Sequence, residues 1–367
     1  MADYRVDNLA KVIVEYCLSV KPKERVAVIG STLSEALMLA VQREVLRAGG
    51  YPHLFPFFPG SQYIRFSESN DDQLDFVSPV MKMAFEEFEC LASLYGLANT
   101  KALTSIDPAK QGRVAKAQAD LMKRYMERAA SGELKWVVTM FPTNAHAQDA
   151  EMSLAEFEDY VYSTMFADTD DPVREWRKIH DEQQRYVDWL SGKEELVVKG
   201  PNVDLTLSIK DRAFINADGV DNMPSGEIFT SPIEDTVEGW IRFTYPAIEM
   251  GREVEGIELK IEKGKVVEAR AEKNEAFLLE MLEVDEGARY VGEFAIGTNK
   301  RINRFIKNIL FDEKTGGTIH MALGAGYPET GSVNKSGIHW DMICDMRDGG
   351  QIFVDDELFY ESGEFKV

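Results

Sequence analysis

The hydrophobic pattern of this chain changes near residue 190, and that change restricts its fold more than any other feature. Before it, apolar segments alternate with helix-forming stretches: residues 25–29 have the pattern of a strand, 36–48 of a helix and 51–57 of a second strand. After it, residues 203–209 place apolar side chains at odd positions and polar ones at even positions, which is typical of a half-buried strand. The sequence therefore predicts two halves of different construction.

The first half is predicted to be α/β with a largely parallel sheet, because helices separate its strands. A helix over residues 107–130 and a strand over 136–140 continue this alternation. The second half is predicted to be α+β with a mainly antiparallel sheet, since Lys263-Gly264-Lys265 joins two alternating runs as a hairpin turn. A chain of 367 residues is longer than one core usually supports. We therefore expect an α/β domain over residues 1–185 and a second domain over residues 186–367.

The charge balance argues against nucleic acid and membrane partners. Lysine and arginine number 41 against 63 aspartates and glutamates, and the net charge of −22 would repel phosphate backbones and anionic lipid. No segment approaches the roughly 18 consecutive apolar residues of a membrane span, and the amino-terminal residues do not have the pattern of a secretory signal. The three cysteines are far apart and are expected to be buried, reduced thiols. These features predict a cytoplasmic location.

Six residues of the second half stand in glycine-bounded or strand-like sequence that rarely carries such side chains for packing alone. They are Glu227, Glu293, His320, Tyr327, His339 and Asp341. His339 and Asp341 are two positions apart in a predicted strand, so a nitrogen and a carboxylate face the same side. Glu227 is expected in a loop that Pro224, Gly226 and Pro232 constrain.

Together these side chains favour a site with two divalent cations. Three carboxylates and two imidazoles form a mixed oxygen and nitrogen set that suits Zn²⁺, Mn²⁺ or Co²⁺. Three negative charges against the four positive charges of two cations leave the site net positive, which promotes ionisation of a bound water. Three of these residues also have an ordinary structural interpretation. His320 is compatible with a hydrogen-bonded core histidine, Tyr327 with a buried ring, and Glu227 with a salt bridge to lysine or arginine.

The order of four motifs resembles the M29 family of metallo-aminopeptidases, of the aminopeptidase T and aminopeptidase S type. The motifs are GE within residues 223–230, GExxIGTN over 292–299, GTIHMALGxGYP over 317–328 and NxSxIHWD over 334–341. The likeness extends to the first half, over residues 12–23, 136–143 and 147–160, and so covers nearly the whole chain. Where family members tend to have a tryptophan, this chain has Asn144-Ala145-His146, which bears on substrate preference. We expect His146 to lie on the surface.

The resemblance implies a cytoplasmic homodimeric enzyme that removes amino-terminal residues from short peptides by a water that two metal ions activate. It places the metal ligands on Glu227, Glu293, His320, His339 and Asp341 and the active-site tyrosine on Tyr327. Tyr327 either coordinates a metal or stabilises the oxyanion of the intermediate, and Glu227 or Glu293 is a hypothetical proton acceptor. One alternative is a metal-dependent hydrolase of another amide or ester. An alternative of a different class is an acidic binding protein with structural metals.

Overall fold

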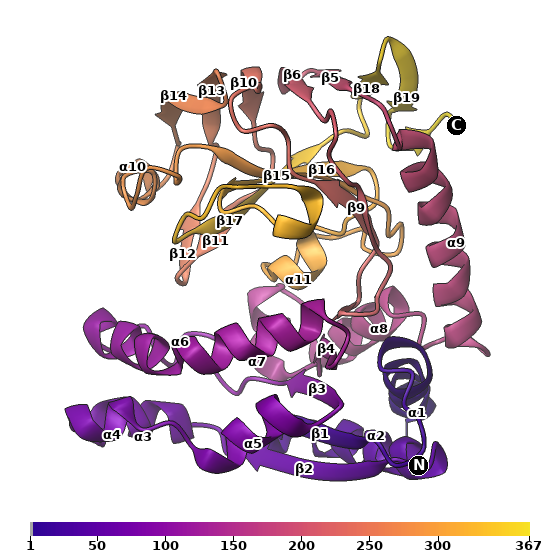
Figure 1. Ribbon diagram of the computed structural model, residues 1–367, viewed down its shortest axis with the longest axis vertical. Helices are drawn as coiled ribbons and strands as arrows, with labels where there is room; N and C mark the ends of the chain where they lie inside the picture. Colours follow the sequence, from indigo (N-terminus) through magenta and orange to yellow (C-terminus); the bar gives the residue numbers. More distant parts are fainter. Residues whose placement is uncertain (1–2) are drawn as a thin grey trace. The chain divides into compact units, whose positions relative to one another are not determined.

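The computed structural model describes residues 3–367, which divide into two compact units. The first unit extends to Trp176 and includes the short segment Gly219–Pro224, and the second contains Arg177–Asp218 and Ser225–Val367 (Figure 1). The division into folding domains at residue 185 stays a prediction. Among the described residues, no helix combines the length and apolarity needed to span a lipid bilayer.

The first unit contains a five-stranded sheet in which every pairing is parallel, in the order β2-β1-β3-β4-β8. This confirms the predicted α/β architecture. Its strands are β1 (Arg25–Ser31), β2 (Tyr51–Phe57), β3 (Cys90–Tyr95), β4 (Lys135–Met140) and β8 (Asn222–Met223). Its helices are α1 (Tyr4–Lys11), α2 (Glu35–Arg47), α3 (Ser61–Glu68), α4 (Asp71–Asp75), α5 (Pro79–Glu87), α6 (Pro108–Ala130), α7 (Asn144–Asp149) and α8 (Leu154–Thr164), and α9 (Pro172–Leu190) leads into the second unit.

Local signals account for several helix ends. Asp107 accepts a hydrogen bond from Ala109 N and precedes Pro108, so α6 begins where its capping residue and its proline require. Ser153 and Glu156 form a capping box at the start of α8. Gly49 has φ +81°, a left-handed conformation that ends α2 before β2.

The expectation that His146 lies on the surface is wrong. Its side chain on α7 is buried, with Nδ1 at 3.2 Å from Thr143 Oγ1. The ring packs edge-on to Tyr95 and also lies beside Phe157. His146 therefore contributes to the interior of the first unit.

The second unit is built from antiparallel sheets, as predicted. An eight-stranded sheet has the order β14-β13-β10-β6-β5-β18-β19-β20, and a five-stranded sheet has the order β17-β16-β15-β9-β7. Apolar side chains from both sheets form one continuous core. The first sheet comprises β5 (Glu195–Gly200), β6 (Val203–Ser208), β10 (Glu238–Arg242), β13 (Glu258–Glu262), β14 (Lys265–Arg270), β18 (Gln351–Val354), β19 (Glu357–Glu361) and β20 (Glu364–Phe365).

The five-stranded sheet carries most of the predicted site residues. It comprises β7 (Ile215–Ala217), β9 (Glu227–Thr230), β15 (Val291–Gly297), β16 (Thr318–Gly324) and β17 (His339–Asp345). Glu227 thus opens a strand, whereas the sequence indicated a loop. The remaining elements are the hairpin β11 (Ala247–Glu249) and β12 (Arg252–Val254) and the helices α10 (Glu275–Met281) and α11 (Ile309–Asp312).

Candidate metal centre

Five of the six predicted site residues lie on one face of the five-stranded sheet. Ala322 on β16 lies between Glu293 on β15 and Asp341 on β17. Two positions along β15, Ala295 lies opposite His320, and two further on, Gly297 lies opposite Glu227 on β9. His339 lies opposite Gly324, two residues from Ala322 on β16. Directly opposed residues of antiparallel strands share a face, as do residues two apart. The polar residues of β9, β15, β16 and β17 therefore gather on one side, while Ile319, Met321 and Leu323 enter the core on the other.

Glu293 reaches this face because of a β-bulge at Gly292. Val291 lies opposite Leu323 and Glu293 lies opposite Ala322, so Gly292 is an extra residue in β15. In a regular strand that kept the register of Val291, Glu293 would instead lie opposite Met321, on the core-directed face. A Cβ on Gly292 would lie 2.3 Å from the carbonyl oxygen of Ala325 and 2.4 Å from that of Gly324. Only glycine fits where the two backbones approach this closely.

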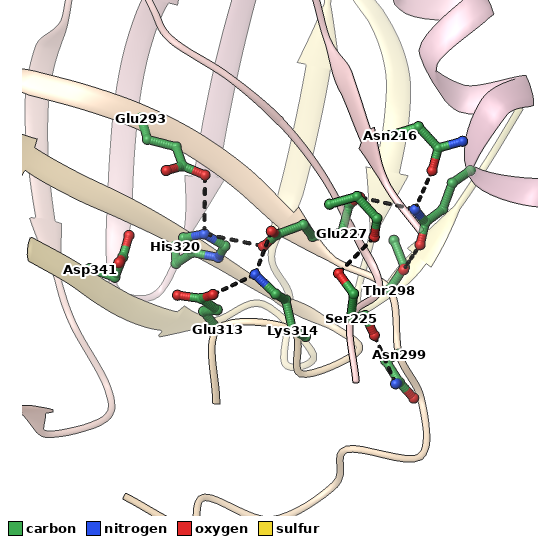
Figure 2. Close-up of polar contacts among 12 residues, drawn as sticks. Asn216, Ser225, Glu227, Glu293, Thr298, Asn299, Glu313, Lys314, His320 and Asp341 are labelled. Carbon is green, nitrogen blue, oxygen red and sulfur yellow. Dashed lines mark hydrogen bonds and ion pairs between the residues drawn. The ribbon is translucent and has the colours of Figure 1, made fainter. Parts of the chain in front are cut away.

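Glu293 connects two imidazoles through different oxygens. Its Oε1 lies 3.5 Å from His320 Nε2, and its Oε2 lies 3.2 Å from His339 Nε2. Glu227 Oε2 is 3.4 Å from the same nitrogen of His320, and Asp341 Oδ1 is 3.5 Å from that of His339. Figure 2 shows the His320 ring between the carboxylates of Glu227 and Glu293. Two compact ligand sets result, Glu227-Glu293-His320 and Glu293-His339-Asp341, and they share Glu293.

Buried atoms without hydrogen-bond partners show that this donor set fits divalent cations. Glu227 Oε2, His320 Nδ1 and Asp341 Oδ1 are buried and have no such partner in the described part of the chain. Burying polar atoms in this condition is costly unless a cation or another group meets them. His339 Nδ1 lies 2.8 Å from the carbonyl oxygen of Ala325, an acceptor that fixes the proton on Nδ1 and leaves Nε2 to coordinate.

In the metal-free cluster, the acids and imidazoles shift one another's pKa values toward their charged forms. Burial disfavours a charged ring at His320, but the carboxylates of Glu293 and Glu227 outweigh it and raise the pKa to about 9. At His339, Asp341 and Glu293 outweigh burial in the same way and raise the pKa to about 11. Burial opposes the charge on Asp341, yet His339 lowers its pKa to about 2.

A charged segment that the sequence analysis missed joins the cluster. Glu313 and Lys314 follow α11, and Glu313 forms a third compact set with His320 and Asp341. Lys314 is 2% exposed, its Nζ lies 2.5 Å from Glu227 Oε1, and it also forms an ion pair with Glu313. The salt-bridge interpretation of Glu227 is therefore correct for one of its oxygens, while the other faces His320. The sequence offered one signal for Glu313 and Lys314: the charged run Asp312-Glu313-Lys314 ends two residues before the glycine-rich motif. Such charged runs are usually solvated.

Side-chain amides fix the backbone beside Glu227. Gln183 on α9 donates through Nε2 to the carbonyl oxygen of Glu227 at 3.0 Å and accepts from Thr298 Oγ1 at 2.7 Å. Asn299 donates through Nδ2 to the carbonyl oxygen of Ser225 at 2.9 Å. Figure 2 shows these contacts around β9. Thr298 and Asn299, the last two residues of the GExxIGTN motif, therefore help to hold the backbone of Ser225 and Glu227 in place.

Tyr327 lies at the edge of the cluster. Its ring is T-shaped to His339 at 5.1 Å between centroids and tilted to Phe229 at 5.2 Å. Burial, with the charges of Glu293 and Asp341, raises the pKa of its hydroxyl, so the phenol stays protonated at neutral pH. Tyr327 therefore brings a hydrogen-bond donor to the site.

Glu249, at the end of β11, is a further carboxylate that the sequence did not indicate. The segment that leads into β11 runs beside β17, where Thr244 N donates to the carbonyl oxygen of Ile343 at 3.0 Å. Glu249 is partly buried, and burial together with Asp341 raises its pKa. It adds negative charge on the side of the His339 and Asp341 set.

Cation binding is expected to release protons at neutral pH. With folded-state pKa values of about 9 and 11, both histidines of metal-stripped protein carry a proton at pH 7, and coordination through Nε2 displaces it. Affinity should therefore rise steeply with pH up to about pH 9 and less steeply up to about pH 11, and about two protons should leave at pH 7. Calorimetric titration with Zn²⁺ in buffers of different ionisation enthalpy measures this number. His339→Gln should release about one proton fewer, and a heat that does not depend on the buffer would contradict the assignment.

The fold and the site define a metal-dependent enzyme with a centre of carboxylates and imidazoles on an antiparallel sheet. The family model described as thermophilic metalloprotease (M29) matches residues 2–365, and the chain belongs to this family. It is a metalloprotease, a hydrolase of peptide bonds.

The curated relatives are aminopeptidases, and their alignments cover most of this chain and of their own length. Aminopeptidase 2 of Geobacillus stearothermophilus is 26% identical over 383 aligned positions, which cover 94% of this chain and 92% of the relative. Aminopeptidase T of Thermus thermophilus is 30% identical over 278 positions, with 70% of this chain and 67% of the relative covered.

Solved structures share the fold. Wild-type AmpT from Thermus thermophilus superposes with a TM-score of 0.86 at 23% identity and 99% coverage of both chains. A 2,5-dihydroxypyridine dioxygenase from Pseudomonas putida KT2440 reaches a TM-score of 0.58 at 16% identity, with 98% of this chain and 96% of the other covered. A fold with two such different relatives does not set the chemistry, so the function has to be argued from the site.

Proposed function

We propose that this chain is an aminopeptidase that removes single residues from the free amino terminus of short peptides, with two divalent cations at the shared centre. Zn²⁺, Mn²⁺ and Co²⁺ all suit the donor set. The observation that carries the proposal is Glu293, whose two oxygens face different imidazoles and belong to both ligand sets. A carboxylate shared between two ions is a common way to build a dinuclear hydrolytic site.

Each cation has its own protein ligands in this proposal. Glu227, Glu293 and His320 hold one, and Glu293, His339 and Asp341 hold the other. The chemistry that bound cations supply is polarisation of the scissile carbonyl and a lowered pKa of water. Glu313 adds a carboxylate beside His320 and Asp341.

The side chains around the cations complete the reaction. The protonated hydroxyl of Tyr327 donates a hydrogen bond to the substrate oxygen that gains negative charge. In other enzymes, removing one such donor lowers turnover by about 10²–10³-fold. Glu227 or Glu293 is the residue proposed to accept the proton of the attacking water. Phe229 packs against Tyr327 and lies opposite Ala295, so it presents an apolar side chain on the same face.

Cellular setting and assembly are part of the proposal. The three cysteines are free and buried, which suits a reducing cytoplasm. The resemblance to aminopeptidases T and S supports a homodimer, and light scattering of the purified protein measures the mass that decides it.

Metal removal tests the proposed function. Stripping with a chelator should abolish hydrolysis of leucyl-p-nitroanilide and of dipeptides, and Zn²⁺, Mn²⁺ or Co²⁺ should restore it, with about two ions bound per chain by elemental analysis. A dipeptide with an acetylated amino terminus is the matched substrate and should not be cleaved. Cleavage of the acetylated peptide or of simple esters alone would indicate a different amide or ester hydrolase. Bound metal without any hydrolysis would indicate a structural role.

A further inference from the structure

Lys314 is a buried cation at the metal centre. Its side chain is 3% exposed, and Nζ contacts carboxylate oxygens of both Glu227 and Glu313 (Figure 2). Removing an ammonium group from water is costly, so a lysine stays charged in such a place only when nearby carboxylates repay that cost. Both groups that contact Nζ are carboxylates, and Glu227 Oε1 lies 2.5 Å away, so this site stabilises the charged ammonium form.

The charge balance of the loaded centre depends on this residue. Glu227, Glu293 and Asp341 supply three negative charges, and Glu313 makes a fourth within the same cluster. Two divalent cations would supply four positive charges, and Glu249 adds a further carboxylate near His339 and Asp341. Lys314 makes the loaded centre one charge unit more positive than these groups alone, which favours ionisation of water and stabilises a developing oxyanion.

We propose that Lys314 is a cation of the metal centre, which holds one oxygen of Glu227, offsets Glu313 and makes the loaded site more electropositive. The inference rests on the two-cation proposal above. Because Lys314 takes Oε1 of Glu227, it leaves only Oε2 on the side of His320. Because its charge is of the same sign as the metal ions, it weakens their binding and strengthens their action on the substrate.

An electrostatic role for Lys314 and a purely structural one predict opposite changes in metal affinity when the residue is replaced. If Lys314 only held Glu227 in position as a ligand, its loss would weaken metal binding and turnover together. If its charge matters, Lys314→Met leaves buried carboxylates without a counter-ion, so metal should bind at least about tenfold more tightly. Turnover should nevertheless fall by about tenfold or more, because the loaded site loses one positive charge.

The experiment measures metal affinity and turnover in parallel. Stripped wild type, Lys314→Met and Lys314→Gln are titrated with Zn²⁺ in a metal buffer, and kcat on leucyl-p-nitroanilide is measured at saturating metal. Glutamine keeps a hydrogen-bond donor for Glu227 without the charge, so it should behave like methionine, with tighter binding and slower turnover. Lys210→Met is the matched control, because Lys210 is an exposed lysine paired with Glu194 at 2.9 Å, and it should change neither quantity.

Weaker metal binding in both Lys314 variants, or an unchanged kcat, would overturn the proposal. Recovery of wild-type values by Lys314→Gln would assign Lys314 a positioning role only. Should stripped Lys314→Met fail to fold in a denaturation experiment, Lys314→Gln still provides both measurements. A wild-type protein that binds a single ion would refute the dinuclear proposal, while the change in affinity for that ion would still test the charge of Lys314.

Discussion

Glu293→Gln is expected to lose both metal ions and to reduce kcat/KM by at least about 10³-fold. The two carboxylate oxygens of Glu293 face His320 and His339 separately, so one substitution weakens both ligand sets. Glutamine has nearly the same shape, but its oxygen is a neutral, weaker ligand, and its amide nitrogen directs hydrogens at one of the two cations. Elemental analysis and steady-state kinetics on leucyl-p-nitroanilide measure the two effects.

A comparison within the site makes this prediction specific. Glu227 belongs to one of the two sets that share Glu293, so Glu227→Gln should release about one ion where Glu293→Gln releases about two. Glu258→Gln, an exposed glutamate on β13, is the control and should keep full metal content and activity. Tight retention of one ion by Glu293→Gln would show that the carboxylate does not connect the two sets, and near-normal activity would show that the ligand assignment is wrong.

Gly292→Ala is expected to abolish activity through the backbone, although it removes no ligand. The added methyl group would overlap the carbonyl oxygens of Ala325 and Gly324 at 2.3 and 2.4 Å, so β15 must move away from the turn that follows β16. That movement displaces Glu293, which is the next residue. Overpacking of this kind also lowers the free energy of unfolding by about 1–3 kcal/mol. We expect a loss of more than about 10²-fold in kcat/KM together with reduced metal content.

Gly337→Ala provides the matched control for this prediction. Gly337 is two residues from His339, but a Cβ there would meet only Asp285 Oδ2, at an ordinary contact distance of 3.4 Å. Its unfolding free energy, from urea denaturation, and its metal content should stay close to wild type. If Gly292→Ala kept its metal and its activity, the bulge would not be what directs Glu293 to the metal face.

The sequence predicts structure well where neighbouring residues determine it, and less well where distant parts of the chain do. The strand over residues 51–57 and the helix that begins at Pro108 are confirmed, because periodicity, proline and capping residues act on neighbouring positions. The pairing of His339 and Asp341 on one face followed from the two-residue repeat of a strand, and the family motifs pointed to the other ligands. Leu9, Val12, Ile13, Tyr16 and Cys17 recur at helical spacing, but the chain continues beyond α1 as a π-helical turn over Val12–Cys17, which periodicity alone does not distinguish from an α-helix.

By itself, the sequence determined the two styles of fold, the family and the candidate ligand types, because each depends on residue chemistry at short, regular spacing. Only the tertiary structure decided that the buried Lys314 and the partly buried Glu313 join the cluster, and that Glu249 lies near His339 and Asp341. It also decided that a bulge in β15 places Glu293 on the same face as the other candidate ligands. The physical reason is that a charged run or a bulge carries no periodic signal, and its surroundings come from strands and loops that are far away in the sequence.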